Sequence, residues 1–164
     1  MTTRREYRLL LAKAQPPGAP ASPGLLLRTP APADTEQLST LMIDAYRGTI
    51  DDGGETLDDA RGEVRSFFEQ GANPPLLACS WVAQAGDELA AASLVAFWTE
   101  RGCPLIAYAM ARAAHKRRGF AGLLVGRCLD SLRAAGYAEV RAVITEGNLP
   151  SERLFARLGF ARIS

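Results

Sequence analysis

A cluster of basic and small residues stands directly before a long amphipathic stretch, and this pairing constrains the fold more than any other feature of the chain. The cluster consists of Lys116, Arg117, Arg118, Gly119, Phe120, Ala121 and Gly122. The stretch behind it predicts a helix over residues 119–135 with one apolar face. The first N–H groups of a helix have no partners inside it, and glycine lets a phosphate approach them closely. The arrangement therefore predicts a polyphosphate site, with a solvated helix start as the alternative.

The charge of the whole chain favours a small ligand over a polymer. The 164 residues carry a formal net charge of +1, and the basic character is local, at Arg112 and residues 116–118. A protein whose main partner is nucleic acid usually carries a larger positive excess. We therefore expect no nucleic acid partner. A chain of 164 residues is most simply one domain.

Cysteines, the single histidine and the apolar runs add three negative expectations. Cys79, Cys103 and Cys128 show no C-x-x-C spacing, and His115 has no ligand set around it, so we expect no metal. The apolar run at 9–12 is too short for the core of a signal peptide, and no run approaches membrane-spanning length. These observations favour a cytoplasmic protein with reduced cysteines and no membrane partner.

Strand-like and helix-like segments follow one another in a mixed order. Strands are predicted over 5–12, 25–28, 76–84, 88–99, 105–111, 140–145 and 159–163, and helices over 35–46, 57–70, 119–135 and 151–158. Short turns between the three central strands favour antiparallel hairpins, so the fold class is mixed α/β (α+β) with a mostly antiparallel sheet. A proline- and alanine-rich segment at 14–24 is typical of a linker. We expect residues 1–24 to form an N-terminal strand and linker, and residues 25–164 to form the main domain.

This order of elements, together with the basic turn, resembles the GNAT superfamily of N-acetyltransferases. The cofactor motif of that family is Gln/Arg-x-x-Gly-x-Gly/Ala, and Lys116, Gly119 and Ala121 match it. Lysine replaces the usual first residue, but Arg117 and Arg118 supply adjacent cations.

A second family run, Asn-x-x-Ala-x-x-Leu-Tyr followed by Gly-Phe, stands about thirty residues further on. The matching residues are Asn148, Leu154, Gly159 and Phe160, with Ser151 in place of the alanine and Phe155 in place of the tyrosine. Both runs occur in the family's order, and the resemblance covers about residues 25–164.

The resemblance implies a twisted sheet whose fourth and fifth strands, residues 105–111 and 140–145, splay apart, with about four flanking helices. Acetyl-CoA would enter that gap, with its pyrophosphate on the N–H groups from about Arg118 to Gly122. The other implied cofactor contacts are the backbone of Ala109, Met110 and Ala111, and the side chains of Asn148, Ser151 and Phe155. Asn148 has a second interpretation, as a turn former before Pro150.

The implied reaction is direct attack of a neutral amine on the acetyl thioester. An alkylammonium acceptor has a pKa of about 10.4, so a base must remove a proton first. Glu146, at the end of the fifth strand, is the first candidate base. Asp51, Asp52 and Glu55 follow, in the loop that borders the acceptor site in the family. These loop acids also suit recognition of a cation, or simple turn and cap roles.

Aromatic residues supply the remaining candidates. Tyr46 and Trp98 either line the acceptor pocket or pack in the core. The family's tyrosine, which assists departure of the thiolate, is replaced by Phe155, which has no proton to give. The pKa of a thiol, about 8.5 in a cysteine, is low enough for the thiolate to leave without full protonation. Tyr108 or a water can assist.

Two functional hypotheses follow. The first is an acetyl-CoA-dependent N-acetyltransferase that acts on a primary amine of a small molecule or a peptide, with a homodimer as a plausible assembly. The second is a non-catalytic acyl-CoA-binding or sensor module, which Phe155 favours. A doubly wound nucleotide enzyme would need Gly-x-Gly-x-x-Gly after its first strand, and that pattern is missing.

Overall fold

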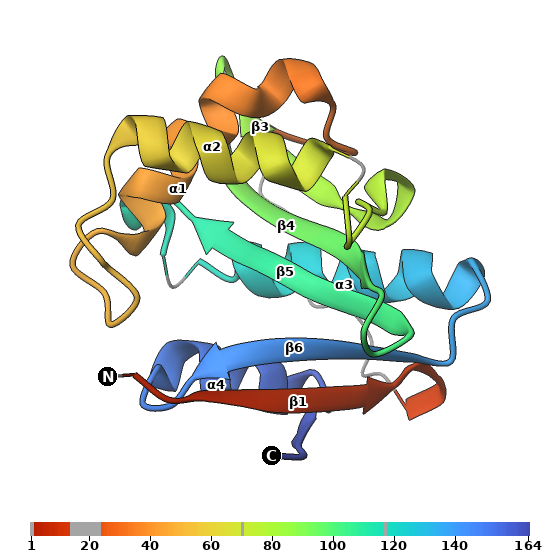
Figure 1. Ribbon diagram of the computed structural model, residues 1–164. Helices are drawn as coiled ribbons and strands as arrows, with labels where there is room; N and C mark the ends of the chain where they lie inside the picture. Colours follow the sequence, from red (N-terminus) through yellow and green to blue (C-terminus); the bar gives the residue numbers. More distant parts are fainter. Residues whose placement is uncertain (1, 14–23, 70, 117) are drawn as a thin grey trace.

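Seven strands form one sheet in the part of the chain that the computed structural model describes, residues 2–13, 24–69, 71–116 and 118–164 (Figure 1). Their order is β2-β3-β4-β5-β6-β1-β7, and every neighbouring pair is antiparallel except β5 with β6. The strands are β1 (Arg4–Leu10), β2 (Leu25–Arg28), β3 (Trp81–Ala85), β4 (Glu88–Trp98), β5 (Cys103–Ala111), β6 (Glu139–Thr145) and β7 (Ala161–Arg162). The helices are α1 (Thr35–Tyr46), α2 (Leu57–Phe68), α3 (Phe120–Ala134) and α4 (Leu149–Arg157). The predicted mixed fold with a mostly antiparallel sheet is confirmed.

Helices cover both faces of the sheet. Helices α1 and α2 pack on one face, and α3 and α4 on the other (Figure 1). Successive residues of the central strand β4 point to opposite cores, since Leu94 belongs to the α1–α2 core and Val95 to the α3–α4 core. This explains why the sequence of β4 is almost continuously apolar rather than alternating.

The strands β5 and β6 separate soon after they meet. Their parallel pairing is confined to Leu105 with Arg141 and Ile106 with Ala142. β5 stays with β4 along its whole length, through a register shift at Leu94/Val95 that bends the pair, whereas β6 stays with β1. These are the fourth and fifth strands counted from residue 25, so the splay expected between residues 105–111 and 140–145 is confirmed.

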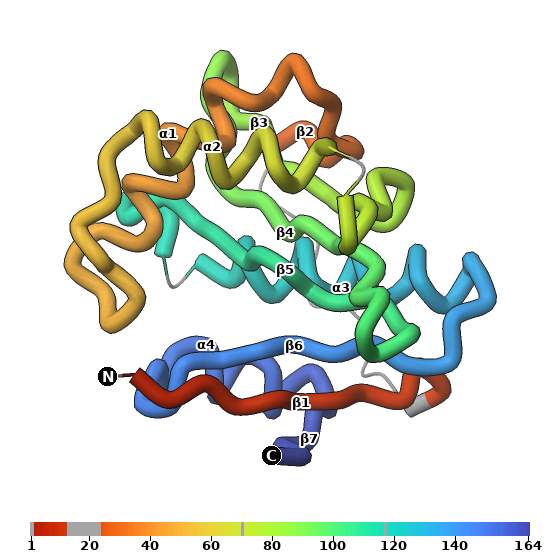
Figure 2. Tube along the Cα trace, viewed as in Figure 1, coloured from red at the N-terminus to blue at the C-terminus, as the bar shows by residue number. Residues whose placement is uncertain are grey.

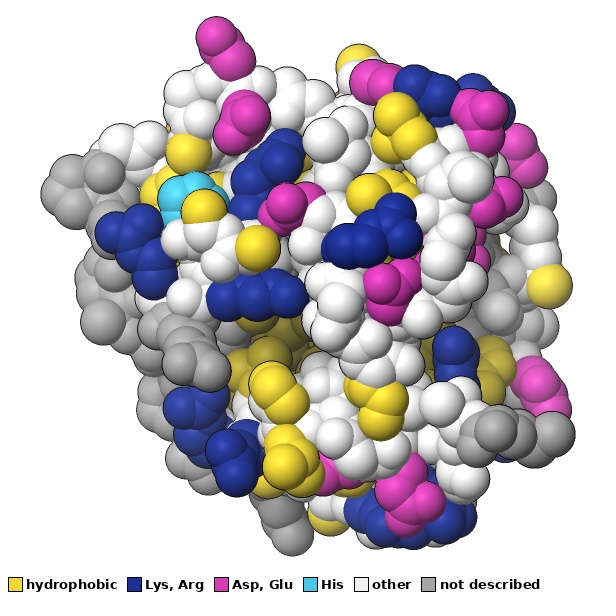
Figure 3. All heavy atoms as spheres, turned by 90° about the vertical axis from the view of Figure 1, so that its left-hand side faces the viewer, with side chains coloured by type: hydrophobic (Ala, Val, Ile, Leu, Met, Phe, Trp, Pro, Cys, Tyr) yellow, Lys and Arg dark blue, Asp and Glu magenta, His cyan; other side chains and the backbone are white. Residues whose placement is uncertain are grey.

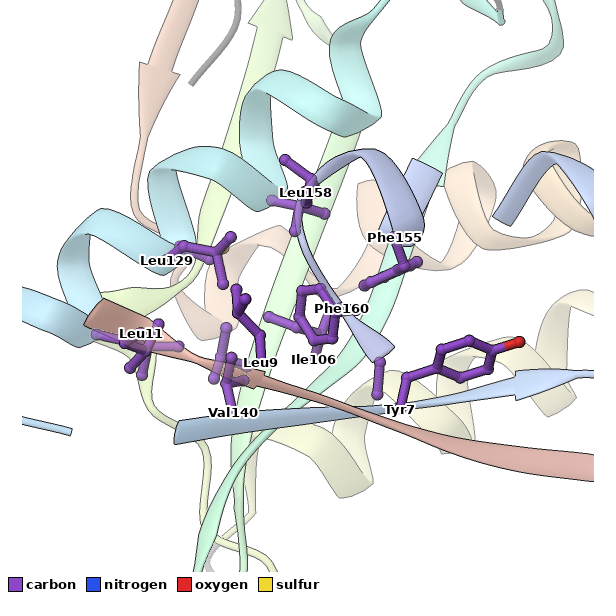
Figure 4. Packing of buried hydrophobic residues seen from close by; sticks show 14 of the residues in the cluster. Tyr7, Leu9, Leu11, Ile106, Leu129, Val140, Phe155, Leu158 and Phe160 are labelled. Carbon is purple, nitrogen blue, oxygen red and sulfur yellow. The ribbon is translucent and has the colours of Figure 1, made fainter. Parts of the chain in front are cut away.

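The N-terminal strand β1 is an inner strand of the sheet. It pairs with β6 from Arg4–Thr145 to Leu10–Glu139, and its other edge pairs with β7 (Figure 2). Tyr7, Leu9 and Leu11 point into the core shared with α3 and α4 (Figure 4). The strand predicted over 5–12 is therefore confirmed up to Leu10, after which Leu11–Lys13 form a 3-10 turn. Residues 14–23 of the predicted linker lie outside the described residues, and the division into 1–24 and 25–164 stays a prediction.

The strand predicted over 76–84 is wrong in its first half. Residues Leu77–Cys79 form a 3-10 turn, and β3 begins only at Trp81. The hydroxyl of Ser80 donates to the carbonyl of Leu76 at 2.9 Å and accepts from the N–H of Val95 at 2.9 Å. A serine side chain that replaces a backbone partner favours a turn over a strand, and the apolar pattern alone does not reveal it.

Three observations on the described residues bear on the remaining expectations. None of their helices is both long and apolar enough to cross a membrane. They contain no group of three His, Cys, Asp or Glu side chains that could hold a metal ion. The three cysteines are free and buried, and burial raises the pKa of the Cys128 thiol to about 12.

Candidate active site

The separating strands β5 and β6 border a cavity of about 760 Å³. Its walls come from α1, α2, β1, β4, β5, β6, α4 and residues 47–56, here called the interhelical loop. Figure 3 shows the side toward which the strands diverge, and this face is hollowed between its upper and lower halves. A cavity of this size suits a small-molecule ligand.

The cavity brings together most of the residues that the sequence suggested for the acceptor and for catalysis. The predicted acceptor residues that line it are Tyr46, Asp51, Asp52, Glu55 and Trp98. The predicted catalytic and cofactor residues that line it are Tyr108, Ala109, Asn148, Ser151 and Phe155. Met110, Ala111 and Glu146 are not part of this lining, nor are the described residues of the basic turn. The roles of all these residues stay predictions.

The start of α3 leaves bare backbone at the basic turn. Gly119 is the N-cap residue and has a φ of 79°, a left-handed conformation that favours glycine. No side chain caps this end, so the N–H groups of Phe120 to Gly122 lack partners within the helix. The N–H of Leu123 is the first to bond back, to the carbonyl of Gly119 at 2.9 Å. A Cβ at Gly122 would lie 3.1 Å from Leu154 of α4, so glycine also permits this close packing.

Cations surround this helix start. The ammonium of Lys116 donates to the carbonyl of Ala45, near the end of α1, at 2.7 Å. The guanidinium of Arg118 lies 3.3 Å from Nδ1 of His115, and both cationic side chains are on the surface. Arg117 lies outside the described residues. Positive side chains and a positive helix end together form an anion-binding arrangement.

Asp51 joins the interhelical loop to the far side of the cavity. Its carboxylate accepts from the hydroxyl of Thr145 at 2.6 Å and from the side-chain amide of Asn148 at 3.0 Å. Asn148 is also the N-cap of α4, and its Oδ1 accepts from the N–H of Ser151 at 3.3 Å. The side chain of Ile50 lies against Gly147 in the same place, where an added Cβ would be 3.4 Å from it. Asp51 therefore connects two parts of the wall that the sequence places far apart.

The other two acids of the interhelical loop hold the loop itself. Asp52 accepts from the N–H groups of Gly48 at 2.8 Å and Gly54 at 2.9 Å, and these bonds lower the pKa of its carboxyl. Glu55 accepts from the N–H of Gly53 at 3.0 Å. The turn roles proposed for these acids are present in the structure, next to the cavity.

Glu63 lines the cavity and was missed in the sequence. It lies on α2, and the hydroxyl of Tyr108 donates to its carboxylate. Burial, followed by this hydrogen bond, raises the pKa of Tyr108, so the phenol is neutral. The available signal was spacing, because Glu63 stands three residues after Ala60 and four before Phe67, so this exposed side chain lies beside the buried face of the helix.

Glu146 is not brought to the cavity. Its carboxylate pairs with Arg5 of β1 at 3.1 Å and with Arg162 of β7 at 3.5 Å. The side chain of Glu146, the first candidate base, therefore points toward surface arginines and not toward Tyr108. Its catalytic role stays an untested prediction with no support from the cavity.

The sequence of residues 24–161 matches the family described as the acetyltransferase (GNAT) domain. The chain belongs to the GNAT acetyltransferase family. The family is one of acetyltransferases. A search of curated proteins found no match.

Solved structures share the fold of this GNAT chain. A GCN5-related N-acetyltransferase from Sphaerobacter thermophilus has a TM-score of 0.74 at 19% identity, over 99% of this chain and 49% of that one, so the chain spans about half of that protein. The ribosomal-protein-S18-alanine N-acetyltransferase from Escherichia coli has a TM-score of 0.65 at 12% identity, over 85% and 79%. AAC(6')-Iy, in complex with the bisubstrate analogue CoA-S-monomethyl-acetylneamine, has a TM-score of 0.61 at 15% identity, over 84% and 90%.

The GNAT position that usually carries a tyrosine is occupied here by Phe155 in a packed environment. Its ring lies edge-on to Phe160, with centroids 5.0 Å apart, within the core shared by α3 and α4 (Figure 4). It also borders the cavity. The wall therefore offers no hydroxyl at this position, and Tyr108 brings one from β5.

Proposed function

We propose that this GNAT domain is an acetyl-CoA-dependent N-acetyltransferase that moves an acetyl group to a primary amine of a small molecule or a peptide by direct attack. The observation that carries the proposal is the separation of β5 from β6 after Ile106, which opens into the cavity. Acetyl-CoA is a substrate of this reaction and would supply the activated acetyl group.

The residues around the separated strands suit acetyl-CoA. Beyond Ile106 the edge of β5 no longer pairs with β6, and Ala109 borders the cavity there with a small side chain. Backbone donors of such an edge can bind an extended amide-containing chain. The bare N–H groups of Phe120 to Gly122, with Lys116 and Arg118 beside them, suit the pyrophosphate.

The acidic side of the cavity suits a cationic acceptor. Its lining includes Glu6, Asp51, Asp52, Glu55 and Glu63, against the two cations Arg4 and Arg47. A cleft with an excess of one charge raises the local concentration of the opposite charge. Two of the similar structures belong to an alanine N-acetyltransferase of a ribosomal protein and to an enzyme bound to an acetylneamine analogue. We keep both peptide and small-molecule amines as acceptors.

A non-catalytic acyl-CoA-binding or sensor module is the alternative, because Phe155 cannot give a proton. A missing general acid costs about 10²–10⁴-fold in rate. The phenol of Tyr108 in the same cavity favours the enzyme over the sensor.

Calorimetry with acetyl-CoA tests the proposal first. We expect binding by the wild type and a loss of affinity in the Lys116→Glu, Arg118→Glu double variant. Arg157→Glu, an exposed change in the last turn of α4, is the control. Release of free CoA with a panel of peptide and polyamine acceptors then separates the two functions. Tight binding without acceptor-dependent release would select the sensor, and no binding at all would refute both.

Two further expectations belong with this proposal. We propose a cytoplasmic location and a homodimer, neither of which the fold by itself requires. Cell fractionation tests the first, and sedimentation equilibrium over a range of protein concentrations tests the second.

A further inference from the structure

Carboxylates line the cavity, and most are already engaged by other protein groups. Glu6 accepts from Arg101 at 2.6 Å and from Arg141 at 3.0 Å. Asp51 is held by Thr145 and Asn148. Each of these two carboxylates is thus oriented by two donors, and a bound amine would have to compete with them.

The acids of the interhelical loop are engaged within the loop. Asp52 accepts from two backbone N–H groups and lies 3.4 Å from the guanidinium of Arg47. Glu55 accepts from the N–H of Gly53. These bonds hold the shape of the loop, so both acids have a structural role.

Glu63 differs from Glu6, Asp51 and Asp52 in having a single partner, and from Glu55 in that this partner is a side chain of another cavity wall rather than a backbone N–H of its own loop. Among the hydrogen bonds and ion pairs of the described residues, its carboxylate has one partner, the phenol of Tyr108. That partner is a neutral phenol, and no cation of the described residues forms an ion pair with the carboxylate of Glu63. Tyr108 is itself fixed edge-on to Phe67 of the same helix, with ring centroids 6.5 Å apart. The geometry therefore presents one aimed, available carboxylate beside the point where β5 leaves β6.

We propose that Glu63 is the base that takes the proton from the acceptor amine and that Tyr108 positions its carboxylate, an inference that rests on the proposed function. The ammonium of the acceptor loses one proton to Glu63, which passes it to solvent. The neutral nitrogen then bonds to the thioester carbonyl carbon, and the C–S bond breaks with its electron pair on sulfur. The second proton that nitrogen loses ends on the thiolate or in water, so the products are the amide and CoA.

Charged and titratable groups from every neighbouring element face this pair. Arg4 comes from β1, Tyr46 from α1 and Asp51 from the interhelical loop. Burial raises the pKa of Tyr46, as it does that of Tyr108, so neither phenol ionises near neutral pH. Arg4 lowers the pKa of both phenols, and Asp51 raises that of Tyr46, but burial outweighs both effects. The two phenols are therefore excluded as the base, and of the two carboxylates in this set Asp51 is held by Thr145 and Asn148.

The test compares Glu63→Gln, Glu63→Asp and Tyr108→Phe with the wild type, using acetyl-CoA and the best acceptor of the amine panel. Glu69→Gln, an exposed change at the end of the same helix, is the control. We expect Glu63→Gln to lower kcat/KM for the amine by about 10²–10⁴-fold at pH 7, with an unchanged affinity for acetyl-CoA by calorimetry. We expect Glu63→Asp to retain part of the activity, and Glu69→Gln to retain all of it.

The pH profile separates a base from a residue that only shapes the pocket. In the wild type the acid limb of log kcat/KM should have a slope of one, and Tyr108→Phe should keep this limb at a lower rate. In Glu63→Gln the activity should instead rise toward the pKa of the free amine and approach the wild type there. A Glu63→Gln variant within threefold of the wild type at pH 7, or with the same acid limb, would overturn the inference alone. A wild type without turnover on any amine would overturn the proposed function as well.

Discussion

Replacing Asp51 with alanine tests how the two sides of the cavity are held together. The variant removes both acceptors that bridge the interhelical loop to Thr145 and Asn148, at 2.6 and 3.0 Å. A hydrogen bond to a charged group contributes about 1.5–3 kcal/mol, and the half-exposed position of Asp51 argues for the lower end. Thr145 is 5% exposed, so its hydroxyl loses a partner where water has little access. We expect a loss of about 2–3 kcal/mol in the free energy of unfolding.

Urea denaturation followed by far-ultraviolet circular dichroism measures this loss, with an unchanged m-value as evidence that the unfolding reaction is the same. A double-mutant cycle with Asn148→Ala isolates the bridge, because Asn148 also caps α4 and its own loss has a second cause. We expect a coupling energy of about 1 kcal/mol for this pair. Glu100→Ala, a change in a side chain that is 76% exposed, is the matched control. An Asp51→Ala loss below about 0.5 kcal/mol, the size expected of an ordinary surface change, would refute the reasoning.

Three further predictions concern stability elsewhere in the fold. Leu129→Ala, in a side chain 1% exposed, should lower the free energy of unfolding by about 2–5 kcal/mol in urea denaturation. Gly119→Ala, at a φ of 79° with open space around it, should lower the free energy of unfolding by about 1 kcal/mol through backbone strain alone. A variant as stable as the wild type would contradict the left-handed conformation at this position. Arg28 lowers the pKa of Asp34 below its ordinary 3.8, so this pair stabilises the fold above that pH and the contribution disappears as pH falls through the lowered value. The stability difference between wild type and Asp34→Asn, measured at pH 7 and pH 3, should therefore shrink, and a constant difference would disprove it.

Local patterns predicted most of the elements and one end of the ligand site. The capping box of α2, with Thr56 and Asp59 bonded reciprocally at 3.1 and 2.8 Å, could be seen in four consecutive residues. The glycine at the start of α3 could be interpreted from its neighbours, because the N–H groups it exposes belong to the next few residues. These features depend on contacts within one turn of helix, so adjacent residues contain the necessary information.

The prediction over 76–84 marks the limit of such patterns. An apolar run favours a strand by composition, but Ser80 bonds to Val95 on another strand, and this contact decides the backbone. The sequence shows the hydroxyl without showing what lies opposite it. The apolar pattern therefore predicted burial of this segment, whereas its conformation depends on a contact with another strand.

The amino-acid order alone indicated the family, the basic turn and the acidic character of the interhelical loop, because each depends on short motifs. Which partners each carboxylate has was decided only when the chain folded. Asp51 meets partners 94 and 97 residues away, and Glu63 meets Tyr108 across 45 residues. The number of donors that hold a carboxylate depends on which strands and helices pack beside it, and packing is not determined by neighbouring residues in the sequence.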